Sequence, residues 1–215
     1  MKKILALALI VGMVSMASAG PDIEFSPGGS ISGNWMYQGT TSSSGVFSFT
    51  QHLDIDAVLG TQTDALYDEF VFLPNLVLTN YVTAMPGVGN GVVAADGIVE
   101  IRAADDTLLL AGTLGEGNYY AIFGTSTIYP ELALDMTVTY VNKVWGSDYL
   151  TTVNVGDIYD LNLSLQYSTN FDTIITSVGN GKNGFSGSMT MMIPEPATML
   201  ILGLGSVLAL RKRSR

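Results

Sequence analysis

Residues 46–60 read VFSFTQHLDIDAVLG, and apolar and polar residues alternate over most of this stretch. Five apolar side chains fall on one face of an extended chain: Phe47, Phe49, Leu53, Ile55 and Ala57. Five polar side chains fall on the other: Ser48, Thr50, His52, Asp54 and Asp56. A repeat of two is the period of a β-strand with one buried face. The stretch therefore predicts a half-buried strand long enough to cross a whole sheet.

The same alternation returns at 132–141 (LALDMTVTYV) and 159–167 (YDLNLSLQY), whereas no segment of the mature region shows a convincing helical stripe. Less regular strand candidates lie at 69–73, 76–82, 97–103, 107–114, 118–124, 172–178 and 185–193. Glycine-rich turn signals separate them, among them PGVGNG (86–91), GEGN (115–118) and GNGKNG (179–184). About ten short strands predict an all-β fold, an antiparallel β-sandwich or jelly roll, with a closed β-barrel as the alternative.

The amino end has the layout of a secretory signal peptide over residues 1–19. Two lysines precede an apolar stretch, and the small residues Ala17, Ser18 and Ala19 precede Gly20, which predicts cleavage between Ala19 and Gly20. The chain is thus expected to pass through the secretion translocon. Residues 20–34 are rich in Gly, Ser and Pro and are interpreted as a leader segment, followed by the β domain at 35–193.

Composition excludes several classes of protein. The chain has no cysteine, so disulfides, thiol catalysis, Cys-based zinc sites and iron–sulfur clusters are excluded. All 19 acidic residues lie between the two ends, where only three basic residues remain: Arg102, Lys143 and Lys182. Such an acidic surface disfavours nucleic acid and favours association with cations.

Candidate catalytic groups are few. His52 is the single histidine, so no site with two imidazoles is possible. Its neighbour Asp54 could orient it as a general base, but an exposed polar strand face is the favoured interpretation. Paired carboxylates could serve an extracellular hydrolase, a remote alternative, and oxygen ligands from Asp56, Asp64, Asp68 or 105–106 would suit calcium. We expect no catalytic residue, no metal site and no cofactor, with calcium the one cation considered.

Three aromatic residues near predicted strand ends or loops are candidates for stacking on sugars: Trp145, Tyr119 and Tyr120. Rings of this kind are more often packed in the core or paired across strands. GNGKNG matches a phosphate-binding glycine pattern by its letters alone, because a strand-like segment follows it where that pattern needs a helix. A hairpin turn explains it better.

Residues 193–215, IPEPATMLILGLGSVLALRKRSR, combine a Pro-Glu-Pro, an apolar run and a basic end. The apolar run, 197–210, would form a helix of about 21 Å, which is short of a hydrocarbon core of about 30 Å. The basic cluster would stay on the cytoplasmic side of a membrane; it consists of Arg211, Lys212, Arg213 and Arg215. The run therefore predicts a transient membrane contact.

The order of Pro194, Glu195 and Pro196, the apolar run and the basic cluster resembles the PEP-CTERM sorting signal of exported proteins in Gram-negative bacteria, here at 194–215. The resemblance implies recognition by an exosortase, with cleavage near the Pro-Glu-Pro. It implies an inner-membrane intermediate and then delivery to the cell surface, the outer membrane or the exopolysaccharide matrix of a biofilm. The chain would be the substrate of the exosortase and not an enzyme. Its mature domain is expected to be a structural or interaction module, with a carbohydrate-binding module as the alternative and extracellular polysaccharide as a possible partner.

Overall fold

The structure is a computed structural model that describes nine stretches of the chain. They are residues 22–26, 35–41, 43–49, 52–85, 88–94, 96–122, 131–165, 180–183 and 185–192. The signal peptide 1–19, the strand candidate 172–178, and the sorting tail 194–215 with its apolar run 197–210 lie outside these residues. All elements discussed below belong to one compact unit, Gly20–Met191. Within the described stretches, no helix is long and apolar enough to cross a membrane.

The unit is built almost entirely of antiparallel strands, so the predicted all-β class is confirmed. The strands are β1 (Ile23–Ser26), β2 (Trp35–Thr41), β3 (Ser44–Phe49), β4 (Leu53–Val58), β5 (Phe70–Phe72), β6 (Leu76–Met85), β7 (Val88–Val93), β8 (Ile98–Arg102), β9 (Leu108–Ile122), β10 (Glu131–Val141), β11 (Ile158–Leu165), β12 (Asn180–Asn183) and β13 (Phe185–Met191). One short helix, α2 (Asp148–Thr152), lies between β10 and β11.

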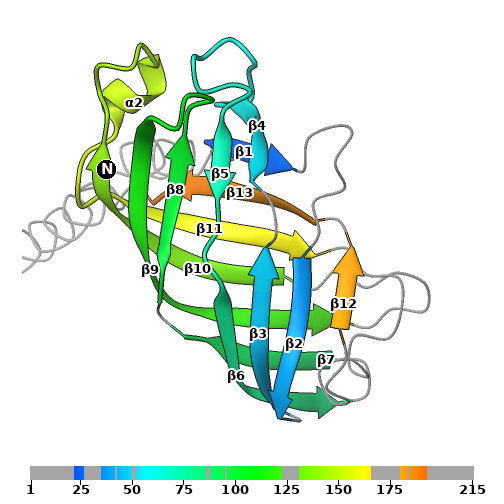
Figure 1. Ribbon diagram of the computed structural model, residues 1–215. Coiled ribbons are helices and arrows are strands. Elements are labelled where there is room, and N and C mark those ends of the chain that lie inside the picture. The colour runs from blue at the N-terminus through cyan, green and yellow to red at the C-terminus, as the bar shows by residue number, and fades with distance from the viewer. Residues whose placement is uncertain are drawn as a thin grey trace, which may run out of the picture. The chain divides into compact units, whose positions relative to one another are not determined.

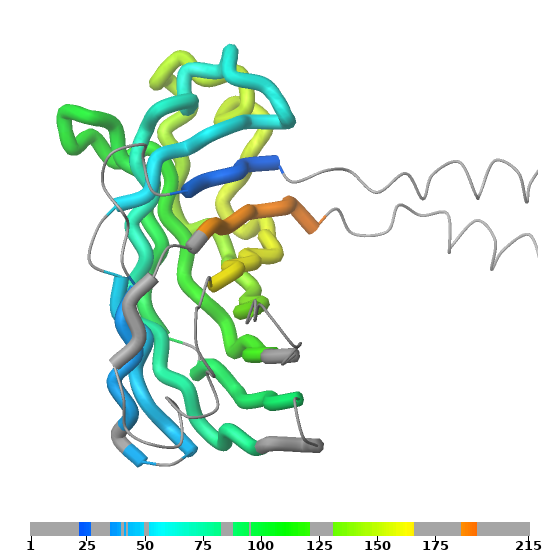
Figure 2. The backbone as a smooth tube through the Cα atoms, turned by 90° about the vertical axis from the view of Figure 1, so that its right-hand side faces the viewer, coloured from blue at the N-terminus to red at the C-terminus, as the bar shows by residue number. Residues whose placement is uncertain are grey.

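Eight strands close into a barrel in the order β10-β11-β13-β1-β4-β5-β8-β9, with β9 pairing back onto β10 (Figure 1). Closure gives each of these strands a partner on both edges, which removes the exposed edges of an open sheet. The arrangement is the barrel given above as the alternative to a sandwich. Figure 2 shows β1 and β13, from opposite ends of the chain, side by side, as their antiparallel register requires.

The long strand β9 joins the barrel to five further strands. Its first half, 108–113, pairs with β8, and its second half, 117–122, pairs with β7 on the same edge, while β10 follows its other edge. From β7 the sheet continues through β6, β3 and β2 to β12. We call these five strands the extension.

Glycines allow β9 to bend against β10. A Cβ on Gly112 would meet the Met136 side chain, and one on Gly117 would meet the Ala133 carbonyl oxygen. Between them the register shifts, so that two residues of β9 face the single residue Asp135. Such a bulge increases twist and helps a sheet to close. The GEGN segment, predicted as a turn, therefore lies inside a continuous strand.

Three other predictions of the strand pattern are corrected. Residues 46–60 do not form one strand: β3 belongs to the extension and β4 to the barrel. The leader 20–34 contributes β1, which pairs with β4 and β13. The turn signals PGVGNG and GNGKNG contain parts of β7 and β12, because pairing with neighbours distant in sequence outweighs the weak strand propensity of Gly and Asn.

The buried side chains divide between barrel and extension. Inside the barrel, register places Leu134, Leu161, Met189, Ile23 and Val58 in one row across five strands. The core of the extension is aromatic, with ring centroids of Tyr37 and Phe47 at 4.9 Å, Phe47 and Tyr119 at 5.8 Å, and Tyr81 and Tyr119 at 6.0 Å. The described buried side chains thus form a core in both parts.

Candidate functional site

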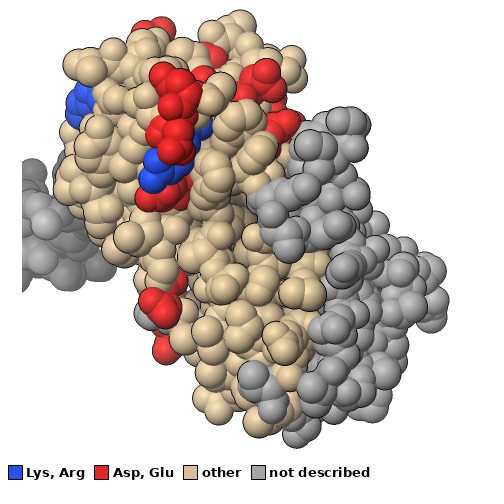
Figure 3. Space-filling view, viewed as in Figure 1, with Lys and Arg blue, Asp and Glu red and all other residues tan. Residues whose placement is uncertain are grey.

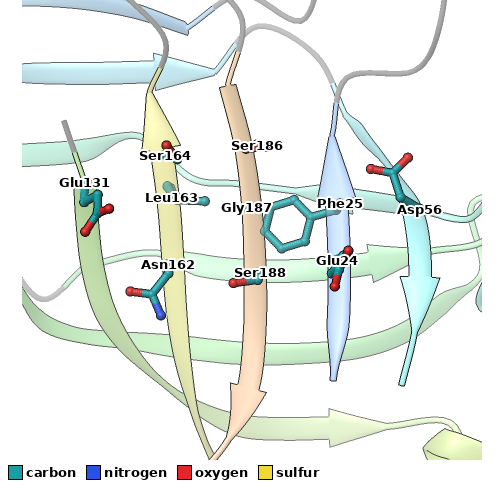
Figure 4. Close-up of a pocket in the computed structure, with 10 residues that line it drawn as sticks. All are labelled: Glu24, Phe25, Asp56, Glu131, Asn162, Leu163, Ser164, Ser186, Gly187 and Ser188. Atoms are coloured by element: carbon teal, nitrogen blue, oxygen red, sulfur yellow. The ribbon is translucent and has the colours of Figure 1, made fainter. Parts of the chain in front are cut away.

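A shallow hollow of about 370 Å³ lies on the outer face of the barrel, across β10, β11, β13, β1 and β4 (Figure 4). It is lined by Glu24, Phe25, Asp56, Glu131, Asn162, Leu163, Ser164, Ser186, Gly187 and Ser188. Its lining combines apolar surface from Phe25, Leu163 and Gly187 with carboxylate, hydroxyl and amide groups. We call this surface the polar hollow.

Strand register explains which side chains reach the polar hollow. Glu131 lies opposite Ser164, which lies opposite Ser186, so these three share one row on one face. Asn162 lies opposite Ser188, which lies opposite Glu24, and they form a second row. Residues at every second position share a face, so Leu163 and Phe25, between the rows, belong to the core.

The hollow exists because its middle strands carry short side chains. Ser164 on β11, with Ser186 and Ser188 on β13, forms the floor, while Glu131 rises on one side and Glu24 on the other (Figure 4). A row of serines between longer carboxylates leaves space above the sheet. The lining residues of the hollow thus all lie on strands of the sheet.

A bulge in β4 adds a further carboxylate to the rim. Glu24 pairs with Ala57 and Phe25 with Ile55, which leaves Asp56 as the extra residue. Asp56 is exposed beside the Glu24 position. The bulge thus turns an outward carboxylate toward the hollow, a common use of bulges near binding surfaces.

The polar hollow is anionic, with three carboxylates and no Lys or Arg among its lining residues. The described basic side chains are engaged elsewhere. Arg102 contacts Glu100 at 2.8 Å and Asp106 at 3.2 Å, and Lys143 donates to the Thr151 carbonyl and to Asn154. On the face drawn in Figure 3, the larger patch of basic atoms lies between acidic ones.

Tyr120, one of the aromatic candidates, lies beside the polar hollow. Its side chain is 50% exposed, and across the β9–β10 pair it is directly opposite Glu131. Directly opposed residues of antiparallel strands share a face, with Cβ atoms about 5 Å apart. The ring therefore extends the row that Glu131 begins.

The other two aromatic candidates do not join Tyr120. Adjacent residues of a strand point to opposite faces, so Tyr119 points into the core where Tyr120 points out. Tyr119 is fully buried in the aromatic core of the extension, and a ligand cannot reach its ring. Trp145 lies in the loop after β10 and is partly buried against the core. Since Tyr120 pairs with the first residue of β10, the length of that strand separates the two rings.

His52 packs against two phenylalanine rings. Its ring centroid lies 4.2 Å from that of Phe70 and 5.8 Å from that of Phe72, and its Nε2 is 4.0 Å from an oxygen of Asp54. Burial raises the pKa of Asp54, an effect that nearby His52 partly offsets. The distance between His52 and Asp54 is too long for a hydrogen bond. The two side chains lie on an exposed strand face, the interpretation favoured from the sequence.

Three other carboxylates, those of Asp64, Glu69 and Asp105, accept hydrogen bonds from backbone amides. Asp64 accepts from the amides of Leu66 at 2.9 Å and Tyr149 at 3.0 Å. Asp105 accepts from the Thr107 amide, and Glu69 from the Ala104 amide. In the described stretches, no three His, Asp or Glu side chains form a group that could hold a metal ion.

The sorting residues lie outside the described part of the chain. These are Ala17, Ala19 and Gly20 at the signal cleavage point, Pro194, Glu195 and Pro196 in the motif, and Arg211, Lys212, Arg213 and Arg215 in the basic cluster. The sequence alone pointed to them. It did not point to the polar hollow, whose residues come from five strands and converge only through register.

Comparison with known protein families finds the PEP-CTERM protein-sorting motif at residues 193–214. The match confirms the resemblance drawn from the Pro-Glu-Pro, the apolar run and the basic cluster. It indicates export, recognition by an exosortase, and sorting to the cell envelope or the extracellular space. No curated protein and no solved structure shows significant similarity to the chain.

Proposed function

We propose that the folded domain is a structural or interaction protein of the cell surface or extracellular matrix of a Gram-negative bacterium, with no catalytic activity of its own. The observation that carries the proposal is the PEP-CTERM motif at 193–214. Asp64, Glu69 and Asp105 accept backbone hydrogen bonds, which supports a structural use of these three acidic residues.

The tail would act in steps that its chemistry favours. After export, the apolar run 197–210 would hold an inner-membrane intermediate, with the basic end on the cytoplasmic side. Pro194 and Pro196 disfavour helix at the motif and keep the chain extended for the exosortase. Cleavage there would release the domain to the cell surface, the outer membrane or the matrix.

Intact-mass measurement tests the sorting step. The full-length gene is expressed in a host that has an exosortase and in the same host without it. We expect a product shortened near residues 194–196 only in the first host. A variant with Pro194, Glu195 and Pro196 replaced by alanine should keep its tail in both. An unchanged carboxyl terminus in the competent host would contradict the proposal.

A carbohydrate-binding module is the second candidate function, and the exposed Tyr120 beside the polar hollow favours it. Tyrosine rings contribute apolar surface with a polar tip, which suits a ligand with both CH and hydroxyl faces. Retention of the exported protein on insoluble polysaccharides, against a protein of similar charge, would test this function before any site is assigned.

A further inference from the structure

We propose that the polar hollow and Tyr120 together form a binding surface for an uncharged oligosaccharide, with one sugar ring stacked on Tyr120 and the next units lying over the serine floor. The inference rests on the carbohydrate-binding function above and gives it a site and a ligand class. It starts from the register of β9, β10, β11 and β13.

The first step is the row that runs from Tyr120 through Glu131 and Ser164 to Ser186. Each residue is the direct partner of the next, so all four side chains share the outer face. Neighbouring strands are about 4.8 Å apart, and the row therefore extends about 14 Å. That length suits a chain of linked sugars running across the strands better than a single sugar.

The second step is the supply of hydrogen-bonding groups beside the ring. The parallel row of Asn162, Ser188 and Glu24 offers an amide that donates and accepts, a hydroxyl that does both, and a carboxylate that accepts. Hydroxyl-rich ligands need this mixture, since each sugar hydroxyl both donates and accepts. An aromatic ring at one end and polar groups along the floor match the two kinds of surface that a sugar presents.

The third step is charge. Glu24, Asp56 and Glu131 surround the hollow without a basic partner among its lining residues. Sulfated or uronic-acid chains would place like charges together, which costs free energy and lowers the rate of association. The surface therefore selects uncharged chains, whose hydroxyls can donate to these carboxylates.

The fourth step is rigidity. All the residues of the proposed surface lie on strands, and the core packs beneath them: Leu163 and Phe25 are both buried. A surface already fixed before binding loses little conformational entropy when a ligand arrives. A shallow hollow that is already formed on a sheet is suited to binding an oligosaccharide with modest affinity.

The experiment uses the exported protein, purified as the host delivers it, in calorimetric titrations. The probes are uncharged oligosaccharides from cellulose, laminarin, xylan and mannan, and the charged chains alginate and heparin. We expect binding to at least one uncharged series, little change between low and high salt, and none to the charged chains. Binding to alginate or heparin but to none of the uncharged chains would overturn the proposal.

Two tyrosine variants locate the site. Tyr120→Ala should weaken binding about ten-fold or more, because it removes the stacking ring. Tyr140→Ala is the matched control: Tyr140 is 42% exposed on β10 but lies opposite Ala111, away from both rows. It should bind as the unmodified protein does. Equal loss in both variants, or none in either, would overturn the site.

Two further variants separate this proposal from the function on which it rests. Ser188→Arg fills the floor with a long side chain directly opposite Glu24, so it should weaken the binding of uncharged chains. Trp145→Ala should leave binding unchanged. If sugars bind and only Trp145→Ala lowers the affinity, the carbohydrate-binding function stands and the proposed site is wrong. If no sugar binds, both fail, while the sorting proposal is judged by mass alone.

Discussion

The phenolic oxygens of Tyr149 and Tyr159 lie 2.7 Å apart in the interior of the domain. Tyr149 comes from α2 and Tyr159 from β11, and both side chains are buried. This hydrogen bond fixes the short helix to a barrel strand. Because each hydroxyl is removed from water, each depends on the other for a partner.

Substitution of these tyrosines should therefore be non-additive. Tyr149→Phe or Tyr159→Phe alone leaves one buried hydroxyl without its partner and should lower the free energy of unfolding by about 1–3 kcal/mol. The double variant removes both groups and should lose less than the sum of the two. Urea unfolding of all four proteins measures the coupling. Additive losses would show that the hydroxyls do not depend on each other.

Alkaline pH should weaken the domain through the same pair. Burial raises the pKa of both tyrosines, and in Tyr149 the neighbouring Tyr159 raises it further. A tyrosine in the unfolded chain ionises near pH 10. Below about pH 10 the two buried tyrosines therefore contribute their full share to the free energy of unfolding. Above it the unfolded state holds fewer protons than the native state, and the free energy of unfolding falls as the pH rises. Urea unfolding between pH 8 and 11 should show a shallower fall in the double Phe variant, and an unchanged fall in exposed Tyr67→Phe.

Asp64 should matter for stability in acid. It joins the loop after β4 to the start of α2, through the Tyr149 amide. Burial acts to raise its pKa, but hydrogen bonds from the Ser147 side chain and from the backbone amides of Leu66, Tyr149 and Asp148 outweigh burial, so the pKa is lowered. A lowered pKa stabilises the fold above the unfolded value near 3.9, and this contribution is lost as pH falls below it.

The matching variant is Asp64→Ala, which should lower the free energy of unfolding at pH 7 by about 1–2 kcal/mol. Its deficit should shrink as the pH falls below about 4, because the stabilisation that comes from the lowered pKa is lost there. Asp96→Ala, at an exposed loop position, is the control and should match the unmodified protein. A deficit independent of pH would mean that Asp64 acts by packing and not by its charge.

The sequence predicts those strands that bury one whole face. β10 and β11 each alternate over eight residues or more, and both appear close to their predicted bounds. β1 and β12 have four residues each, too few to show a period, and they are strands because distant partners supply their hydrogen bonds. Barrel closure depends on the β9–β10 register, which no local pattern specifies.

The polar hollow is hidden from the sequence for a related reason. Its serines and carboxylates occupy the outward positions of five strands, and on each strand they look like any solvated face. Tyr119 and Tyr120 look equivalent as neighbours, yet one is buried and the other exposed, because register sets which of them faces the core. The residues of the sorting tail, by contrast, are adjacent in the sequence, so the motif can be recognised without knowledge of the fold.

Leu59 offers a stabilising change. With Gly60 it forms the two-residue loop after β4, closed by hydrogen bonds between Val58 and Thr61, and its φ is 50°. Its side chain is 61% exposed. A left-handed backbone costs leucine about 1 kcal/mol that asparagine largely avoids, and Asn-Gly is the favoured pair in such loops. Leu59→Asn should raise the midpoint of urea unfolding, whereas Leu59→Val should lower it.

Gly187 tests the link between the barrel interior and the polar hollow. It lies on β13 between Ser186 and Ser188, and a Cβ there would overlap the Phe25 ring and the Leu163 side chain. Gly187→Ala should therefore lower the free energy of unfolding by about 1–3 kcal/mol through overpacking. Phe25→Leu in the same chain makes room and should recover part of that loss, although alone it costs stability. Urea unfolding of the single and double variants measures the recovery. If Gly187→Ala is neutral, Phe25 does not need the glycine, and the close packing beneath the serine floor is not what holds β13 in place.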